Sequence, residues 1–266
     1  PVMIDEINKM LLQLKFKGMA QKLDEIMADV QRAGASPETL LLQVLREEWR
    51  YRQERSMQYR ITQAKLPWKW SIETFPFEQQ PGVSPHQIRS LAGLDFIKRS
   101  ENIVFIGPPG TGKSGLAMGL LRQALLNGYR GRFYNAQDMI DELYASLADQ
   151  STPRLLKRLT HYDLLVIDEI GYLNLKPEQV NAFFKLMEQR YHRKSTIITT
   201  NLEYDQWYEL FQRKSLVDAL LDRLRHRCIT IRIDGPSLRE PSEKQPSTES
   251  DDQNGVTPES SHSDPN

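Results

Sequence analysis

The sequence predicts an α/β protein in which a parallel five-stranded sheet lies between helices and follows a small all-helical N-terminal domain. Three observations predict this fold. Residues 3–65 carry apolar side chains at helical spacing. From residue 102 onward, short apolar runs alternate with helical stretches, which is typical of a parallel sheet covered on both faces. A glycine-rich loop joins the first of these runs to the helix that follows it.

Composition limits the class of protein. The 266 residues are 39% hydrophobic and 26% charged, with 35 basic and 35 acidic side chains. A single cysteine, Cys228, excludes an internal disulfide framework and suits a reducing compartment. No apolar run approaches the roughly 20 residues of a membrane helix, and Asp5 and Glu6 lie where an export signal is basic. We therefore expect a cytoplasmic protein with no membrane partner.

Charge is unevenly distributed along the chain. Residues 241–266 hold six acidic side chains, one lysine and almost no apolar residues, so we expect a disordered acidic tail rich in serine and proline. The preceding 240 residues are mildly basic, which is compatible with a nucleic-acid partner. The remaining predicted domains are a helical N-terminal domain at 1–66, a linker at 67–84 and an α/β domain at 85–240.

The N-terminal domain is predicted to contain several helices. Gly18 is expected to interrupt the first helical stretch. Ser36 and Pro37 then supply a hydroxyl cap and a first-turn proline for a helix that runs to about residue 65. Its apolar side chains are expected to be buried: Leu41, Val44, Leu45 and Trp49.

The same helix carries a cluster of basic residues. Between residues 46 and 69 there are seven basic and three acidic side chains, interleaved with tyrosine and tryptophan. A solvated helix face and a phosphate-contacting arm explain this pattern about equally well. The candidate DNA-contacting residues are Arg46, Arg50, Arg52, Arg55 and Arg60.

The α/β domain is predicted from its apolar runs. A helix starts at Ser84 and Pro85. Strands are expected at residues 103–106, 132–134, 164–167, 195–200 and 228–233. One helix is expected to follow the glycine-rich loop and to end at residue 126. Further helices are expected at 137–148, 153–160, 177–192 and 216–227. The core is expected to include Trp207, Phe211, Val217, Leu220, Leu221 and Leu224.

The glycine-rich loop matches the nucleotide-binding pattern G-x-x-x-x-G-K-[ST] in full, between a strand and a helix. Glycines let backbone N–H groups point at phosphate oxygens, and the helix N-terminus adds positive potential. Lys113 is expected to reach the β- and γ-phosphates of ATP, and Ser114 to ligate Mg²⁺. The fold class is therefore a P-loop NTPase, and the loop residues are Gly107, Pro108, Pro109, Gly110, Thr111, Gly112, Lys113 and Ser114.

Polar residues end the next apolar runs. Asp168 is placed to hold the Mg²⁺ ion with its water shell, and Glu169 to orient or deprotonate an attacking water. This pair favours hydrolysis over small-molecule kinase activity. Asn201 either contacts the γ-phosphate or the water, or caps the following helix. Arg223, Arg225 and Arg227 form a solvated basic face or include an arginine finger for a neighbour's nucleotide.

Together these motifs resemble the IstB helper ATPases of bacterial insertion sequences, which are AAA+ proteins related to DnaC helicase loaders and DnaA initiators. The resemblance covers about residues 5–239. It rests on the phosphate loop, on AKLP at 64–67 before it, and on the motifs after it, which separate the chain from generic AAA+ proteins. These later motifs are LLVIDEIGY at 164–172, QRY at 189–191, STIITTN at 195–201 and ALLDRL at 219–224.

The resemblance implies an ATPase that uses ATP and Mg²⁺, forms a homo-oligomer on double-stranded DNA and assists a transposase. It implies hydrolytic roles for Asp168 and Glu169, a sensor role for Asn201 and a finger role for Arg223. The chain leaves no room for the helical lid of many AAA+ proteins, so no second sensor arginine is assigned. The alternatives are a DnaC-like helicase loader and a nucleotide-regulated DNA-binding scaffold with little turnover.

Overall fold

The computed structural model describes residues 2–171, 173 and 175–239. The acidic tail expected at 241–266 lies outside the described residues. Within the described part of the chain, no helix is both long enough and apolar enough to span a membrane.

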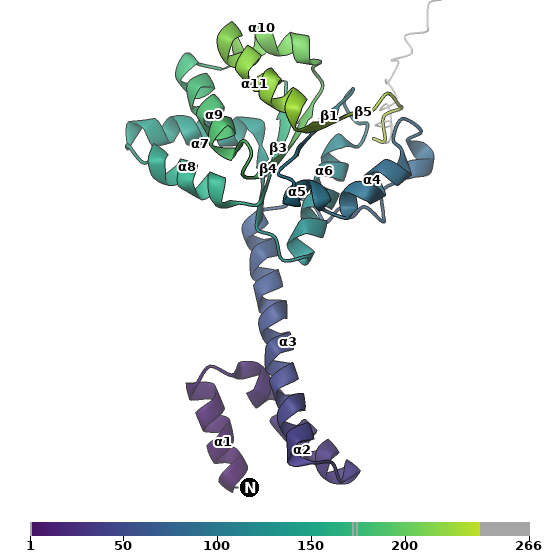
Figure 1. Ribbon diagram of the computed structural model, residues 1–266, viewed down its shortest axis with the longest axis vertical. Helices are drawn as coiled ribbons and strands as arrows, with labels where there is room; N and C mark the ends of the chain where they lie inside the picture. The colour runs from purple at the N-terminus through teal and green to yellow at the C-terminus, as the bar shows by residue number, and fades with distance from the viewer. Residues whose placement is uncertain (1, 172, 174, 240–266) are drawn as a thin grey trace, which may run out of the picture.

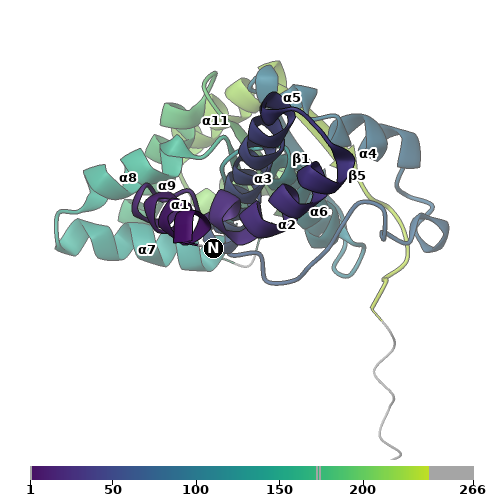
Figure 2. The ribbon, with the colours of Figure 1, turned by 90° about the horizontal axis from the view of Figure 1, so that it is seen from below.

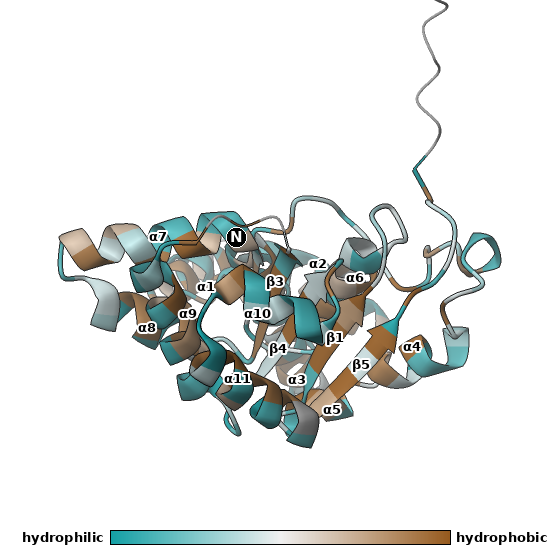
Figure 3. Ribbon diagram, turned by 90° about the horizontal axis from the view of Figure 1, so that it is seen from above, coloured by the Kyte–Doolittle hydropathy of each residue, from teal (hydrophilic) through white to brown (hydrophobic). Residues whose placement is uncertain are grey.

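Five parallel strands form one sheet in the order β2-β3-β4-β1-β5. Helices cover both faces, which is why apolar residues predominate in the middle of the strands, and Figure 3 draws much of β1 and β5 in brown. The predicted parallel five-stranded sheet is thereby confirmed. The bounds are β1 Asn102–Ile106, β2 Gly131–Asn135, β3 Leu164–Ile170, β4 Ser195–Thr200 and β5 Cys228–Arg232.

One strand differs from its prediction in a way that affects the site. β3 continues past residue 167 and includes both Asp168 and Glu169. Its register against β4 shifts between Ile167 and Ile170. The two acidic residues therefore belong to an irregular strand end rather than to a turn after the strand.

Two hydrophobic cores lie on opposite faces of the sheet (Figure 1). Alternate residues of β1 enter different cores: Val104 and Ile106 the first, Ile103 and Phe105 the second. The first core is covered by α7 Ala136–Ala148, α8 Thr152–His161, α9 Pro177–Arg190, α10 Trp207–Phe211 and α11 Lys214–His226. The second is covered by α4 Pro85–Ala92, α5 Asp95–Lys98 and α6 Lys113–Leu126. The predicted core residues of α10 and α11 are buried: Trp207, Phe211, Val217, Leu220, Leu221 and Leu224.

The N-terminal helices form an arm that projects from the sheet domain. They are α1 Val2–Gln13, α2 Lys17–Ala33 and α3 Pro37–Ala64. The long α3 is the stalk, and α1 and α2 lie beside its far end (Figures 1 and 2). Ser36 caps α3 as predicted, because its hydroxyl accepts a hydrogen bond from the Thr39 amide at 3.4 Å. Two hydrogen bonds attach the near end of α3 to the sheet domain, from Arg60 to the Leu125 carbonyl and from Arg132 to the Gln63 carbonyl.

The prediction that Gly18 interrupts the first helical stretch is wrong. The break lies before it, and α2 begins at Lys17. Gly18 is buried inside α2, where an added Cβ would lie 2.6 Å from the Tyr51 Cβ atom of α3. The glycine is therefore required by the close approach of two helices, which a single sequence does not distinguish from a helix break.

The burial predicted along α3 is mostly wrong. Val44 is buried against Met19 and Leu23 of α2. Leu41, Leu45 and Trp49 are 61%, 49% and 66% exposed. Helix α3 packs on α2 along one narrow face only, so these apolar side chains remain on its open side.

Residues between α3 and α4 pack on α6 without forming a long helix; they contain only the short 3₁₀ helix η1 Phe77–Gln79. Ile72 and Phe75 are buried in the second core, and Trp70 lies against Gly115 of α6. This segment therefore runs beside the helix that starts at the phosphate loop. A second 3₁₀ helix, η2 Tyr204–Gln206, precedes α10.

Candidate functional site

The phosphate loop connects β1 to α6. Gly110 and Gly112 have φ angles of 81° and 92°, a left-handed conformation that favours glycine. The Thr111 hydroxyl donates to the Pro108 carbonyl at 2.9 Å and so closes the loop on itself. Because α6 begins at Lys113, its free N-terminal amides lie beside the loop, where they favour an anion.

Lys113 supplies a cation at this helix N-terminus. Its side chain is buried, and its Nζ atom donates to the Pro108 carbonyl at 2.6 Å. Burial lowers the pKa of Lys113, while the charges of Asp168 and Glu169 oppose that shift and Arg239 adds to it. The ammonium group therefore lies among acids and a second cation at the same site.

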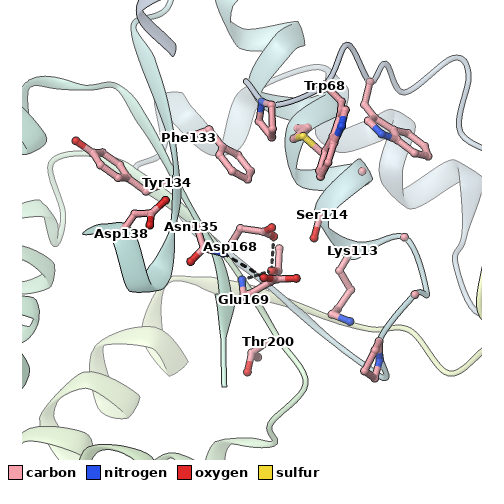
Figure 4. Close-up of a pocket in the computed structure, with 18 of the residues that line it drawn as sticks. Trp68, Lys113, Ser114, Phe133, Tyr134, Asn135, Asp138, Asp168, Glu169 and Thr200 are labelled. Atoms are coloured by element: carbon pink, nitrogen blue, oxygen red, sulfur yellow. Dashed lines mark hydrogen bonds between the residues drawn. The ribbon is translucent and has the colours of Figure 1, made fainter. Parts of the chain in front are cut away.

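Asp168 lies at the end of β3, across from the loop (Figure 4). Its carboxylate is buried and accepts a hydrogen bond from the Thr199 hydroxyl of β4 at 2.6 Å. Burial raises the pKa of Asp168, whereas hydrogen bonds from Thr199 and Ser114 lower it. A buried carboxylate beside the Ser114 hydroxyl is a donor pair that fits Mg²⁺, which proteins bind through few ligands together with substrate phosphates.

Glu169 points into the site from a strained backbone. Its φ angle is +65°, which is uncommon for a residue with a side chain, and its amide donates to the Thr199 hydroxyl at 2.9 Å. Its carboxylate is exposed and accepts a hydrogen bond from the Asn135 side-chain amide at 3.1 Å (Figure 4). Two neighbouring strands therefore fix both the backbone and the carboxylate of this residue.

These groups line one cavity of about 860 Å³. Most of the predicted nucleotide residues border it, and Asn201 joins them from the end of β4. Gly107, Pro108 and Thr111 do not line it, and the last two shape the loop through hydrogen bonds with loop or linker residues. The predicted residues that line the cavity are Pro109, Gly110, Gly112, Lys113, Ser114, Asp168, Glu169 and Asn201.

Arg223 does not border this cavity. It lies on α11, where it pairs with Glu188 at 3.2 Å and stacks over the Tyr191 ring at 5.8 Å. Within one chain, the predicted finger and the phosphate loop are therefore not brought together.

The candidate DNA-contacting arginines lie along α3, away from the cavity. Arg50 and Arg52 form ion pairs with Glu47 and Glu48 at 3.0 and 2.7 Å. Arg55 stacks over Tyr51, and Arg60 is tied to the Leu125 carbonyl. The Arg46 side chain has no ion-pair partner among the residues that the structure describes, and it is exposed.

Sequence reasoning missed Asn135 and Thr199, which hold the two acids from either side. Asn135 follows an apolar run just before a helix, so its sequence signal is that of a helix cap. It does cap α7, because its Oδ1 atom accepts from the Gln137 amide at 3.0 Å. That bond leaves its amide nitrogen facing Glu169.

The chain is similar to known proteins over most of its length. The family described as IstB-like ATP-binding proteins matches residues 9–246. The chain belongs to this family. One of its relatives, the insertion sequence IS21 ATP-binding protein of Pseudomonas aeruginosa, is 36% identical over 234 residues, 88% of this chain and 88% of that protein.

Solved structures support the same fold. The crystal structure of the DnaC helicase loader has a TM-score of 0.54 and 25% identity, and the match covers 64% of this chain and all of that one. AMPPCP-bound DnaA from Aquifex aeolicus has a TM-score of 0.52 and 20% identity, covering 62% of this chain and 50% of that one. The predicted AAA+ fold and the IstB resemblance are both confirmed.

Proposed function

We propose that this IstB-like chain is a cytoplasmic ATPase that assembles as a homo-oligomer on double-stranded DNA and assists a transposase. The observation that carries the proposal is the convergence of Lys113, Ser114, Asp168 and Glu169 on one cavity at the edge of the sheet. The named relative from an insertion sequence supports the link to transposition.

In this proposal the loop amides and Lys113 bind the triphosphate of ATP. Ser114 and Asp168 would hold Mg²⁺, which neutralises phosphate charge when bound. Glu169 accepts a proton from water as the water oxygen bonds to the γ-phosphorus, and the bond from that phosphorus to the ADP oxygen breaks. Asn201, which lines the same cavity, would contact the γ-phosphate or the water. Because Arg223 lies outside its own chain's cavity, it would act on the nucleotide of a neighbouring copy.

Phosphate release tests the chemistry. Wild type should release phosphate from ATP with Mg²⁺ and DNA, whereas Glu169→Gln should bind ATP and DNA but release phosphate at least about a hundredfold more slowly. Glu178→Gln, an exposed acid in the first turn of α9, serves as the matched control. If wild type releases no phosphate with DNA present, the scaffold alternative replaces the ATPase.

DNA binding requires a separate test. Several phosphate contacts should make log affinity fall with log salt by roughly 0.9 per contact. Replacing Arg46, Arg50 and Arg55 by glutamine should weaken binding to all sequences alike, while Arg154→Gln on α8 should not. Arg52 is left intact because it pairs with the buried Glu48. An affinity that does not change with salt would contradict the proposal.

The second candidate function is a DnaC-like helicase loader. The likeness to the DnaC crystal structure, which is covered over its whole length, favours it. Both candidates share the same nucleotide chemistry and differ in the protein partner. Stimulation of a transposase encoded beside this chain would support the first, and loading of a replicative helicase would support the second.

A further inference from the structure

A cavity of about 500 Å³ lies on the arm, where the turn between α1 and α2 contacts α3. Four basic side chains and one acidic side chain line it together with Tyr51. The charged lining residues are Lys15, Lys17, Glu48, Arg52 and Arg55. The four basic side chains are exposed, whereas Glu48 is buried. This basic cavity therefore presents a cluster of cations to its surroundings.

The single acid does not neutralise the cluster. One carboxylate oxygen of Glu48 accepts from two amides at the start of α2, at 2.8 and 3.2 Å, and the other pairs with Arg52 at 2.7 Å. The helix end is thereby satisfied, so the positive charge of the cavity comes from side chains. Within the described part of the chain, no ion pair involves the other three cations, which are Lys15, Lys17 and Arg55.

The chain itself carries an acidic segment that the family match does not include. The match to IstB-like proteins ends at residue 246. Beyond it, residues 249–252, here called the acidic segment, hold three acids in four positions: Glu249, Asp251 and Asp252. No lysine or arginine lies between residues 245 and 266. The charge of the acidic segment therefore complements that of the three unpaired cations.

The acidic segment is close enough along the chain to reach the basic cavity. Arg239, the last described residue, lines the nucleotide cavity together with Lys65, the C-cap of α3. Arg55 lies ten residues before Lys65, which is about 15 Å along a helix. The thirteen residues from 240 to 252 span up to roughly 43 Å when extended. Contact within one chain is therefore possible without a second copy.

We propose that the acidic segment occupies the basic cavity of its own chain and competes there with DNA phosphates. This rests on the proposed function, in which the arm binds DNA. Carboxylates and DNA phosphates present the same chemistry to lysine and arginine, namely anionic oxygens. A tethered segment has an effective concentration of the order of millimolar, so weak ion pairs suffice for competition. The acidic segment thereby lowers the affinity of the arm for DNA.

DNA titrations of the full chain measure the competition. The neutral-segment variant, Glu249→Gln with Asp251→Asn and Asp252→Asn, should bind DNA about three- to tenfold more tightly than wild type at roughly 50 mM salt. The gain should shrink as salt rises to roughly 0.3 M, because ions screen exposed charges. Ser247→Ala with Ser250→Ala keeps every charge and is the control. An unchanged affinity at low salt overturns the inference.

Variants of the arm distinguish occupation of the cavity from general repulsion between the acids and DNA. The cavity variant replaces the three unpaired cations by glutamine: Lys15, Lys17 and Arg55. In that background, neutralising the acidic segment should raise DNA affinity less than about twofold. The matched control variant replaces three exposed basic residues of α1 and α2 outside the cavity, and there the full gain should remain: Lys9, Lys22 and Arg32. An equal gain in both backgrounds would mean repulsion without contact and overturns the inference.

Carbodiimide cross-linking tests the contact without DNA. It joins a lysine amine to a nearby carboxylate, and mass spectrometry of the full chain should find Lys15 or Lys17 joined to the acidic segment. The exposed ion pair of Lys98 and Asp95, at 2.9 Å, is the internal control for the reaction. Absence of the first link when the control pair is joined overturns the inference, and so does a link found only between different chains.

The outcomes separate this inference from the proposed function. If wild type binds DNA and the neutral-segment variant binds it equally well, the competition is overturned while the proposed function stands. If neither binds DNA, the proposed role of the arm and the competition are both overturned. Circular dichroism checks that each variant folds.

Discussion

Asn135 makes two hydrogen bonds that serve different purposes. Its carbonyl oxygen caps α7 through the Gln137 amide, and its nitrogen donates to the Glu169 carboxylate. The cap fixes which end of the amide faces the acid, so a local helix signal also orients the group proposed to handle water. A hydrogen bond to a carboxylate contributes about 1.5–3 kcal/mol.

Asn135→Ala should lower kcat for ATP hydrolysis about tenfold with little change in ATP affinity, because Glu169 loses its orienting partner. Steady-state kinetics with an independent measurement of ATP binding checks this. Asn135→Ser, which retains a capping oxygen, separates the loss of the cap from the loss of the nitrogen donor. A rise in kcat would mean that the bond holds Glu169 away from the water instead.

The loop residues and both acids could be predicted because each lies in a local pattern with a specific chemical meaning. Asn135 and Thr199 could not, since their roles depend on β2 and β4 flanking β3. That strand order comes from tertiary packing, and no single segment encodes it. The irregular end of β3 had no sequence signal for the same reason.

At the scale of the helices, Glu48 of α3 caps the N-terminus of α2. Its carboxylate accepts from the Gly18 and Met19 amides at 2.8 and 3.2 Å and pairs with Arg52. Burial raises the pKa of Glu48, but these hydrogen bonds outweigh it and the pKa is lowered overall. The contribution to stability is therefore present above the ordinary value of 4.5 and is lost as the pH falls through the lower folded-state pKa.

Glu48→Gln should reduce the free energy of opening of α2 by about 1–3 kcal/mol at pH 7, and the difference from wild type should shrink below pH 4.5. Hydrogen exchange of α2 amides, corrected for intrinsic rates at each pH, measures this. Glu54→Gln, an exposed acid on the same helix, is the control. A difference that persists unchanged at low pH would show that the charge of Glu48 is not responsible.

Helices with strong apolar periodicity were predictable from the sequence, but the elements that pack against them were not. The start of α3 followed from Ser36 and Pro37. The exposure of one side of α3 could not be predicted, because an apolar stripe in the sequence is the same whether or not another helix covers it. Leu41, Leu45 and Trp49 form such a stripe: we expected them to be buried, and the structure shows them exposed.

At the scale of the whole molecule, the arm and the sheet domain carry separate parts of the proposed function. The DNA-contacting candidates lie on α3, which projects from the sheet domain (Figure 1). The cavity at the phosphate loop is lined by residues at the ends of β3 and β4. Arg223 lies outside that cavity, held by Glu188 and Tyr191. Under the proposed function, a neighbouring copy supplies Arg223 to this site.

Mixing inactive variants tests this arrangement. Arg223→Ala should lower the ATPase rate about 10³- to 10⁵-fold, and Lys113→Ala should bind no ATP. Mixing the two should restore activity, because a Lys113→Ala subunit still offers Arg223 to a neighbour that holds ATP. Arg213→Ala at the start of α11 is the control and should remain active alone. No recovery in the mixture would place the finger elsewhere.

Binding of ATP in the cavity at the phosphate loop is measured by calorimetry of the purified protein with ATP and Mg²⁺. We expect saturable binding of one ATP per chain in wild type and no binding in folded Lys113→Ala. A folded wild-type chain that binds no ATP, or a Lys113→Ala variant that binds it unchanged, would show that this cavity is not the ATP site.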